Sequence, residues 1–176
     1  RINDASPLIN YSEFRYNGNS NSDNNGRGIY ASGGSSRITN CDIHHNQKGI
    51  EIYFSNTNGI VSYNTIRDNS PRGGGTIGTA NFSYNTIKNN TYDWNYSYEQ
   101  AAGIKVSSSN CIFNYNTITE NYAGNSDVYA SGLVLNQAAE VTGNLIYKNT
   151  GSSSWLNHYQ HGNVSVYFLN FSMDSG

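Results

Sequence analysis

The chain has 176 residues, of which 36% are apolar and only 12% are charged, and its net charge is −2. This balance excludes the basic surface of a nucleic-acid-binding protein, and no apolar stretch approaches the roughly 20 residues that a membrane span requires. Fifteen Tyr, six Phe and two Trp argue against disorder, which avoids aromatic residues. We therefore predict one folded domain over residues 1–176, with no nucleic-acid partner and no membrane insertion.

The sequence repeats one phrase along its whole length. Aligned on their last Ile and last Asn, six segments share one register: INYSEFRYN (9–17), ITNCDIHHN (38–46), VSYNTIRDN (61–69), FSYNTIKNN (82–90), FNYNTITEN (113–121) and VTGNLIYKN (141–149). The chain starts inside this pattern, and we expect it to be a segment of a longer protein. Two columns are apolar throughout, and the last column is always Asn.

A second strand is predicted in each repeat. After a variable insert, a Gly is usually followed by alternating residues, as in GIY (28–30), GIEI (49–52), GIKV (103–106) and GLVL (132–135). The period-two pattern and the content of Asn, Thr and Gly exclude helix. A repeat of roughly 21 to 31 residues made of short strands predicts an all-β solenoid, a single-stranded parallel β-helix of about seven coils. The bias of parallel crossovers predicts a right-handed one.

The Asn and Ile columns have a structural explanation in this fold. Equivalent residues of successive coils stack about 4.8 Å apart, so the Ile columns fill the core. The Asn columns stand at bends, where each amide can bond to the next coil and to the bent backbone. Asn64, Asn85, Asn116 and Asn144 are predicted at one such bend.

These repeats resemble those of right-handed parallel β-helix proteins of the pectate-lyase-like group, with PbH1-type repeats. That group includes polysaccharide lyases, glycoside hydrolases, uronan epimerases and cell-surface proteins. The Asn- and Tyr-rich composition of the repeats, with the sequences YNTI and NN, also resembles the disaggregatase-associated β-helix domains of methanogen surface proteins. The resemblance implies an extracellular or cell-surface location and a uronate-containing polysaccharide as partner.

Three long inserts are predicted to form the functional site. TYDWNYSYEQAA (91–102), YAGNSDVYAS (122–131) and TGSSSWLNHYQH (150–161) leave the same corner of successive coils and should lie side by side. Aromatic rings stack on sugar rings, and acids and amides bond to hydroxyl groups. The predicted sugar-binding residues in these inserts are Tyr92, Trp94, Tyr98, Tyr122, Tyr129, Trp155 and Tyr159, and the predicted catalytic residues are Asp93, Glu99, Asp127 and His158.

Three functions stay open at this point. A lyase needs a base and a cation that neutralises the uronate carboxylate, for which Arg72 and Lys105 are candidates. A hydrolase needs two carboxyl groups about 5 to 9.5 Å apart. The alternative is a non-catalytic carbohydrate-binding, structural or oligomerisation module, in which the same aromatic residues cover the coil or a neighbouring subunit. If the inserts are not the site, the strand face that carries Glu51 and Lys105 is the next candidate.

Other polar residues receive weaker interpretations. The run NGNSNSDNNG (17–26) offers oxygen atoms for calcium but lacks spaced carboxylates, so no cofactor is predicted, with calcium as the alternative. One of His44 and His45 is interpreted as a polar surface residue, and no metal ligand is predicted. Cys41 and Cys111 belong to coils about 14 Å apart and should both be free. The apolar run near the C-terminal end favours a homo-oligomer, by analogy with other β-helix surface proteins a trimer.

Overall fold

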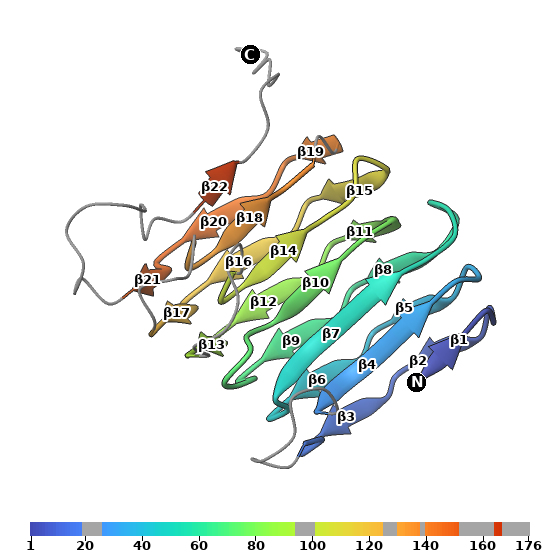
Figure 1. Cartoon of the computed structure of the whole chain (residues 1–176), viewed down its shortest axis with the longest axis horizontal. Coiled ribbons are helices and arrows are strands. Elements are labelled where there is room, and N and C mark those ends of the chain that lie inside the picture. The colour runs from blue at the N-terminus through green and yellow to red at the C-terminus, as the bar shows by residue number, and fades with distance from the viewer. Residues whose placement is uncertain (19–25, 94–100, 125–129, 138–139, 152–163, 167–176) are drawn as a thin grey trace.

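The protein is a solenoid of parallel strands (Figure 1). The computed structural model describes residues 1–18, 26–93, 101–124, 130–137, 140–151 and 164–166. The described residues contain no helix, and hence none long and apolar enough to cross a membrane. Within the described residues, six coils each contribute one strand to each of three sheets, a seventh contributes a strand to the first sheet only, and the fourth to sixth coils add a strand to a fourth sheet.

Sheet A has seven strands: β1 (Ile2–Asn3), β4 (Arg27–Ser32), β7 (Lys48–Tyr53), β10 (Gly75–Ile77), β14 (Ile104–Val106), β18 (Leu133–Leu135) and β22 (Val164–Val166). Sheet B has six: β2 (Leu8–Asn10), β5 (Arg37–Thr39), β8 (Ile60–Ser62), β11 (Ala80–Ser83), β15 (Cys111–Asn114) and β19 (Glu140–Thr142). Sheet C has six: β3 (Glu13–Arg15), β6 (Asp42–His44), β9 (Thr65–Arg67), β12 (Thr86–Lys88), β16 (Thr117–Thr119) and β20 (Leu145–Tyr147). Sheet D has three: β13 (Thr91–Tyr92), β17 (Tyr122–Ala123) and β21 (Thr150–Gly151).

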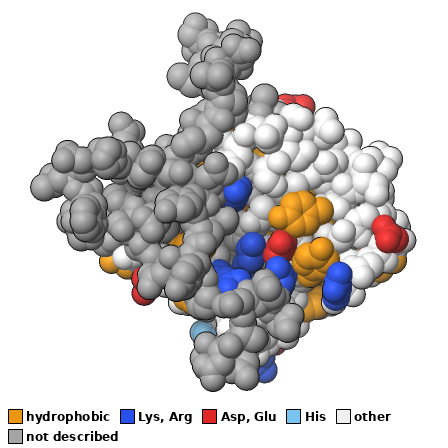
Figure 2. Space-filling model, in the orientation of Figure 1, with side chains coloured by type: hydrophobic (Ala, Val, Ile, Leu, Met, Phe, Trp, Pro, Cys, Tyr) orange, Lys and Arg blue, Asp and Glu red, His pale blue; other side chains and the backbone are white. Residues whose placement is uncertain are grey.

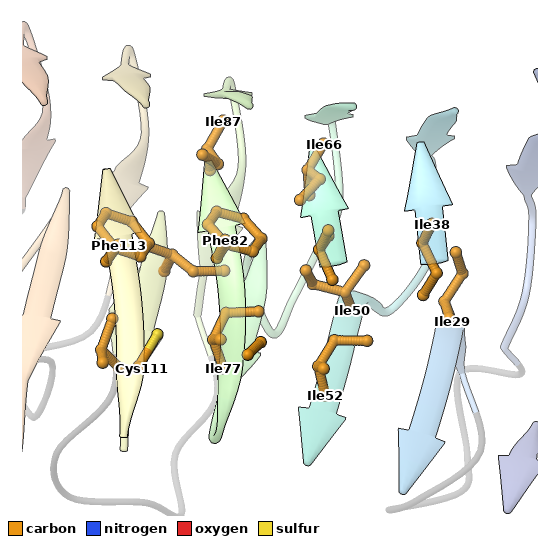
Figure 3. Close-up of a cluster of buried hydrophobic side chains, with 14 of the residues drawn as sticks. Ile29, Ile38, Ile50, Ile52, Ile66, Ile77, Phe82, Ile87, Cys111 and Phe113 are labelled. Carbon is orange, nitrogen blue, oxygen red and sulfur yellow. The ribbon is translucent and has the colours of Figure 1, made fainter. Parts of the chain in front are cut away.

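The pairing confirms the parallel β-helix and its register. Ile43 pairs with Ile66, Ile66 with Ile87, and Ile87 with Ile118, so one predicted apolar column is continuous through sheet C. The other column runs through sheet B, where the rings of Phe82 and Phe113 stack 5.2 Å apart. Figure 3 shows these side chains filling the space between the sheets. The structure divides each repeated segment at its bend into a strand of sheet B and a strand of sheet C.

The corner between sheets B and C depends on a ladder of buried Asn side chains. The backbone N and Nδ2 of Asn64 both donate to Oδ1 of Asn85, each at 3.0 Å, and Nδ2 of Asn85 donates to the carbonyl oxygen of Val61 at 2.9 Å. Asn116 repeats the pattern with Asn144 on the next coil. The residue before each Asn has a left-handed backbone, which turns the chain. The predicted role of Asn64, Asn85, Asn116 and Asn144 is therefore confirmed.

A second Asn ladder closes the end of sheet C beside a column of glycines. Nδ2 of Asn69 donates to Oδ1 of Asn90 at 2.9 Å and to the carbonyl oxygen of Ile43 at 3.0 Å. A Cβ atom on Gly74 would meet the carbonyl oxygen of Gly103, and one on Gly103 would meet that of Gly132. Gly49, Gly74 and Gly103, at or beside the starts of β7, β10 and β14, are thus required by close backbone approach.

Both cysteines are buried and free, as predicted. Cys41 occupies the corner position that Asn64 takes on the next coil, and its backbone N donates to Oδ1 of Asn64 at 2.9 Å.

Candidate functional site

The outer face of sheet A gathers charged side chains from successive coils. Strand alternation points Ile29, Ile50 and Ile77 into the core, so the residues that alternate with them point outward. The register then aligns one outward column: Tyr30, Glu51, Thr76, Lys105 and Val134. Figure 2 shows Lys and Arg side chains around one acidic side chain on this face, with hydrophobic side chains beside them.

One end of this face is covered by the described ends of the inserts. Ala101 and Ala130 form a bridge with each other and pack on Val134, which is fully buried. Tyr53, the last residue of β7, is 38% exposed. Sheet A therefore has a covered part at β18 and a partly exposed part at the C-terminal end of β7.

Three cations and one carboxylate define what we call the cationic site: Arg27, Lys48, Arg72 and Glu51. The Arg27 guanidinium pairs with the Glu51 carboxylate, and Lys48 Nζ lies 3.4 Å from the same oxygen. Arg27, Lys48 and Arg72 also line a small cavity together with Gly26 and Gln47. Three positive charges against one negative charge leave this site with a net charge of +2.

Burial and pairing shift the pKa values in the cationic site in opposite ways. Burial lowers the pKa of Lys48, although the Glu51 carboxylate opposes that shift. Burial alone would raise the pKa of Glu51, but Lys48 and Arg27 outweigh it and hold that pKa below its usual value. Burial, with the Glu51 charge, raises the pKa of Tyr53 to about 12, so its hydroxyl stays a donor at neutral pH.

Of the predicted site residues, five lie in the described part of the chain. The strands that open the three inserts are paired, with Thr91 opposite Tyr122 and Tyr122 opposite Thr150, so the inserts begin side by side as predicted. Tyr122 is 45% exposed, and Asp93 is exposed one residue beyond β13. Arg72 forms an isolated antiparallel β-bridge with Tyr92 through the backbone, and Lys105 lies in the outward column of sheet A.

Tyr92 has a different environment from the one expected for a sugar-stacking residue. Its side chain is only 3% exposed and packs with Ala102 and Ala123. Alternation within β13 directs Tyr92 inward and Thr91 outward, and Ala123 and Gly151 follow Tyr92 in the same column. Ala123 and Gly151 have small side chains, and this is the feature of the sequence that indicates that the Tyr92 ring fills the interior.

The remaining predicted residues lie outside the described residues: Trp94, Tyr98, Glu99, Asp127, Tyr129, Trp155, His158 and Tyr159. Most of the NGNSNSDNNG run lies outside them as well. Sequence reasoning missed Arg27 and Lys48, although their signal was present. Arg27 and Lys48 are the first residues of β4 and β7, and each is followed by a glycine of the glycine column, which therefore aligns the two cations.

Comparison with known proteins agrees with this architecture. The family model described as a right-handed β-helix region matches residues 3–171. Neither a curated protein nor a solved structure matches the chain. The match spans nearly the whole sequence and agrees with the parallel pairing of all the sheets, so the chain belongs to the right-handed β-helix family.

Proposed function

We propose that the chain binds an acidic, uronate-containing polysaccharide on the outer face of sheet A, at the cell surface or in an extracellular matrix. The observation that carries this proposal is the cluster of cations on sheet A. Arg27, Lys48 and Arg72 come from three successive coils and line one cavity, and Lys105 lies on the next coil, in the outward column of Glu51. A polyanion that runs along the solenoid axis would meet a cation from each of these four coils, which are about 4.8 Å apart. Tyr53, the last residue of β7, offers a partly exposed ring to a sugar.

If the chain cleaves its ligand, β-elimination suits this face better than hydrolysis. Elimination needs a cation near the uronate carboxylate and a base that removes the neighbouring proton. Arg27 and Arg72 supply the cation, and Lys48, whose pKa is lowered by burial, is the candidate base. Glycoside hydrolysis needs two carboxyl groups, and the cationic site contains one, that of Glu51.

Binding is tested with polygalacturonate as the acidic probe and dextran as the neutral one. We expect the parent to bind only polygalacturonate and to bind it more weakly as salt rises. Arg27→Gln combined with Arg72→Gln should weaken binding about tenfold or more, which corresponds to about 1.4 kcal/mol. Arg37→Gln is the matched control, because Arg37 is an exposed cation on sheet B. Equal binding by both variants, with unchanged melting temperatures, would refute the proposal.

The same mixtures separate the chemical alternatives. Absorbance of unsaturated uronate together with new reducing ends identifies a lyase, and reducing ends alone identify a hydrolase. Binding without either signal identifies a non-catalytic module. Loss of elimination in Lys48→Met, with binding kept, would assign the base.

A further inference from the structure

The outer face of sheet C holds two adjacent imidazoles that point toward each other. His44 is the last residue of β6 and is 5% exposed, and His45 follows it at the corner with a φ of 52°. Consecutive side chains of a strand normally point to opposite faces, but the left-handed backbone of His45 interrupts that alternation. The two Nδ1 atoms are 2.6 Å apart, and the ring planes cross at 80°.

The partner on the other nitrogen of His44 fixes which atoms carry lone pairs. Nε2 of His44 lies 2.8 Å from Oε1 of Glu13, on the neighbouring coil. An ionised carboxylate only accepts hydrogen bonds, so Nε2 of neutral His44 carries the hydrogen and its Nδ1 carries a lone pair. That lone pair faces Nδ1 of His45, and the 2.6 Å separation is that of a hydrogen bond in which Nδ1 of His45 is the donor.

We propose that His44 and His45 bind a divalent transition-metal ion, such as Cu²⁺, Ni²⁺ or Zn²⁺, which replaces the proton between their Nδ1 atoms. Imidazole nitrogen is a preferred ligand for these ions. Histidine ligands commonly donate their second ring N–H to a carboxylate, which orients the ring and raises its basicity, and Glu13 is placed to do this for His44.

The two arginines that flank His44 in the register, Arg15 and Arg67, are both paired with carboxylates. Arg67 donates to Asp42 at 2.8 and 3.1 Å and to Asp68 at 2.7 Å. Asp42 lies 3.9 Å from Nε2 of His44, so Glu13, at 2.8 Å, is the nearer carboxylate. Arg15 Nε lies 3.4 Å from Glu13, so three carboxylates face two guanidinium groups and the net charge is −1. The ring of Tyr16 lies 5.3 Å from that of His45 and covers one side.

The remaining coordination positions are left to water. No group of three or more His, Cys, Asp or Glu ligands exists within the described part of the chain. The ion is therefore expected to bind more weakly and exchange faster than in a closed four-ligand zinc site. The histidine pair belongs to sheet C and the cationic site to sheet A, so this proposal is independent of polysaccharide binding.

The test is titration of the full chain with CuCl₂, with calorimetry for affinity and electron paramagnetic resonance for nitrogen ligands. We expect one ion coordinated by two imidazole nitrogens, and affinity that falls as acid protonates the rings. His45→Ala should abolish this signal. Glu13→Gln, which keeps an acceptor for His44 but removes the charge, should weaken binding by about 10- to 100-fold.

The control uses the other two of the four histidines. The double variant His158→Ala/His161→Ala should bind copper with the parent affinity and spectrum. Loss of the signal in this control, an unchanged signal in His45→Ala, or a parent spectrum without two imidazole nitrogens would each overturn the proposal.

Discussion

Replacement of Asn85 by Ala tests whether the corner ladder stabilises the solenoid. Asn85 is 1% exposed, and its Oδ1 accepts a hydrogen bond from the backbone N–H of Asn64 at 3.0 Å. An unpaired buried N–H costs about 1 to 3 kcal/mol. The side chain also donates to Val61 O and Asn116 Oδ1, and each lost bond adds about 1 kcal/mol. We expect Asn85→Ala to lower the free energy of unfolding by about 3 to 5 kcal/mol.

The matched control is Asn144, which makes the same kind of bonds at a half-buried position. It accepts from the backbone N of Asn116 at 2.8 Å and donates to Phe113 O at 2.7 Å. Water can replace the lost amide there, so Asn144→Ala should cost less than about 2 kcal/mol. Urea denaturation of both variants, with unchanged m-values, gives the comparison. Equal losses, or a loss below about 1 kcal/mol for Asn85→Ala, would show that buried amide pairing does not hold the corner.

Three further changes test neighbouring features. Cys41→Asn should raise the free energy of unfolding, measured by urea denaturation, by about 1 kcal/mol. An amide at this position can donate to the carbonyl oxygen of Ile9 and so extend the Asn ladder by one coil. A less stable variant would contradict this expectation. Gly103→Ala should lower the melting temperature through a loss of about 1 to 3 kcal/mol, since its Cβ would meet Gly132 O; a neutral result would mean that the glycine column is not tightly packed. The pKa of Glu51 is held below its usual value, so its stabilising effect is present above about pH 4.5 and is lost as pH falls through the folded-state pKa. The melting temperature of the parent should therefore exceed that of Glu51→Gln at neutral pH and approach it in acid, and a constant difference would exclude this linkage.

The fold was predictable because its constraints repeat in every coil. Ile87 and Asn90 each face an equivalent residue on both neighbouring coils, so the same side chain is needed again and the sequence shows a column. The outward residues have no such requirement. Arg27 and Lys48 face each other on one pair of coils only, so the glycine column aligns the two positions but does not repeat the cation on every coil.

Backbone conformation also decides which contacts a corner residue makes. His45 is exposed, which agrees with a polar surface residue, but the sequence does not indicate its contact with His44. Its left-handed φ directs the ring toward His44, and nothing in a pattern of polar and apolar residues encodes that direction. Side chains at corners are therefore the part of such a chain that needs coordinates before chemistry can be assigned.

The tyrosine column at the corner of sheets B and C helps to decide which surface can hold a sugar. Tyr63, Tyr84 and Tyr115 are exposed, and their rings stack in parallel 5.1 to 5.2 Å apart. Each has a left-handed backbone, a conformation that costs a non-glycine residue roughly 1 to 2 kcal/mol. Gly143 lies against the ring of Tyr115, since a Cβ atom there would be 2.5 Å from it.

Tyr84 therefore has both ring faces covered, by Tyr63 and Tyr115, and Tyr115 lies between Tyr84 and Gly143, so these two rings expose mainly their edges and hydroxyl groups. Sugar stacking requires an open ring face. The column thus stabilises the corner, through aromatic contacts that offset the backbone cost, rather than forming a platform for a saccharide. The outer face of sheet A differs in its charges, because Tyr53, whose ring lies against Gly78, belongs to the strand that carries Glu51 and the cations paired with it. Of these two aromatic surfaces, sheet A is the one that places cations near a partly exposed ring, as an acidic polysaccharide requires.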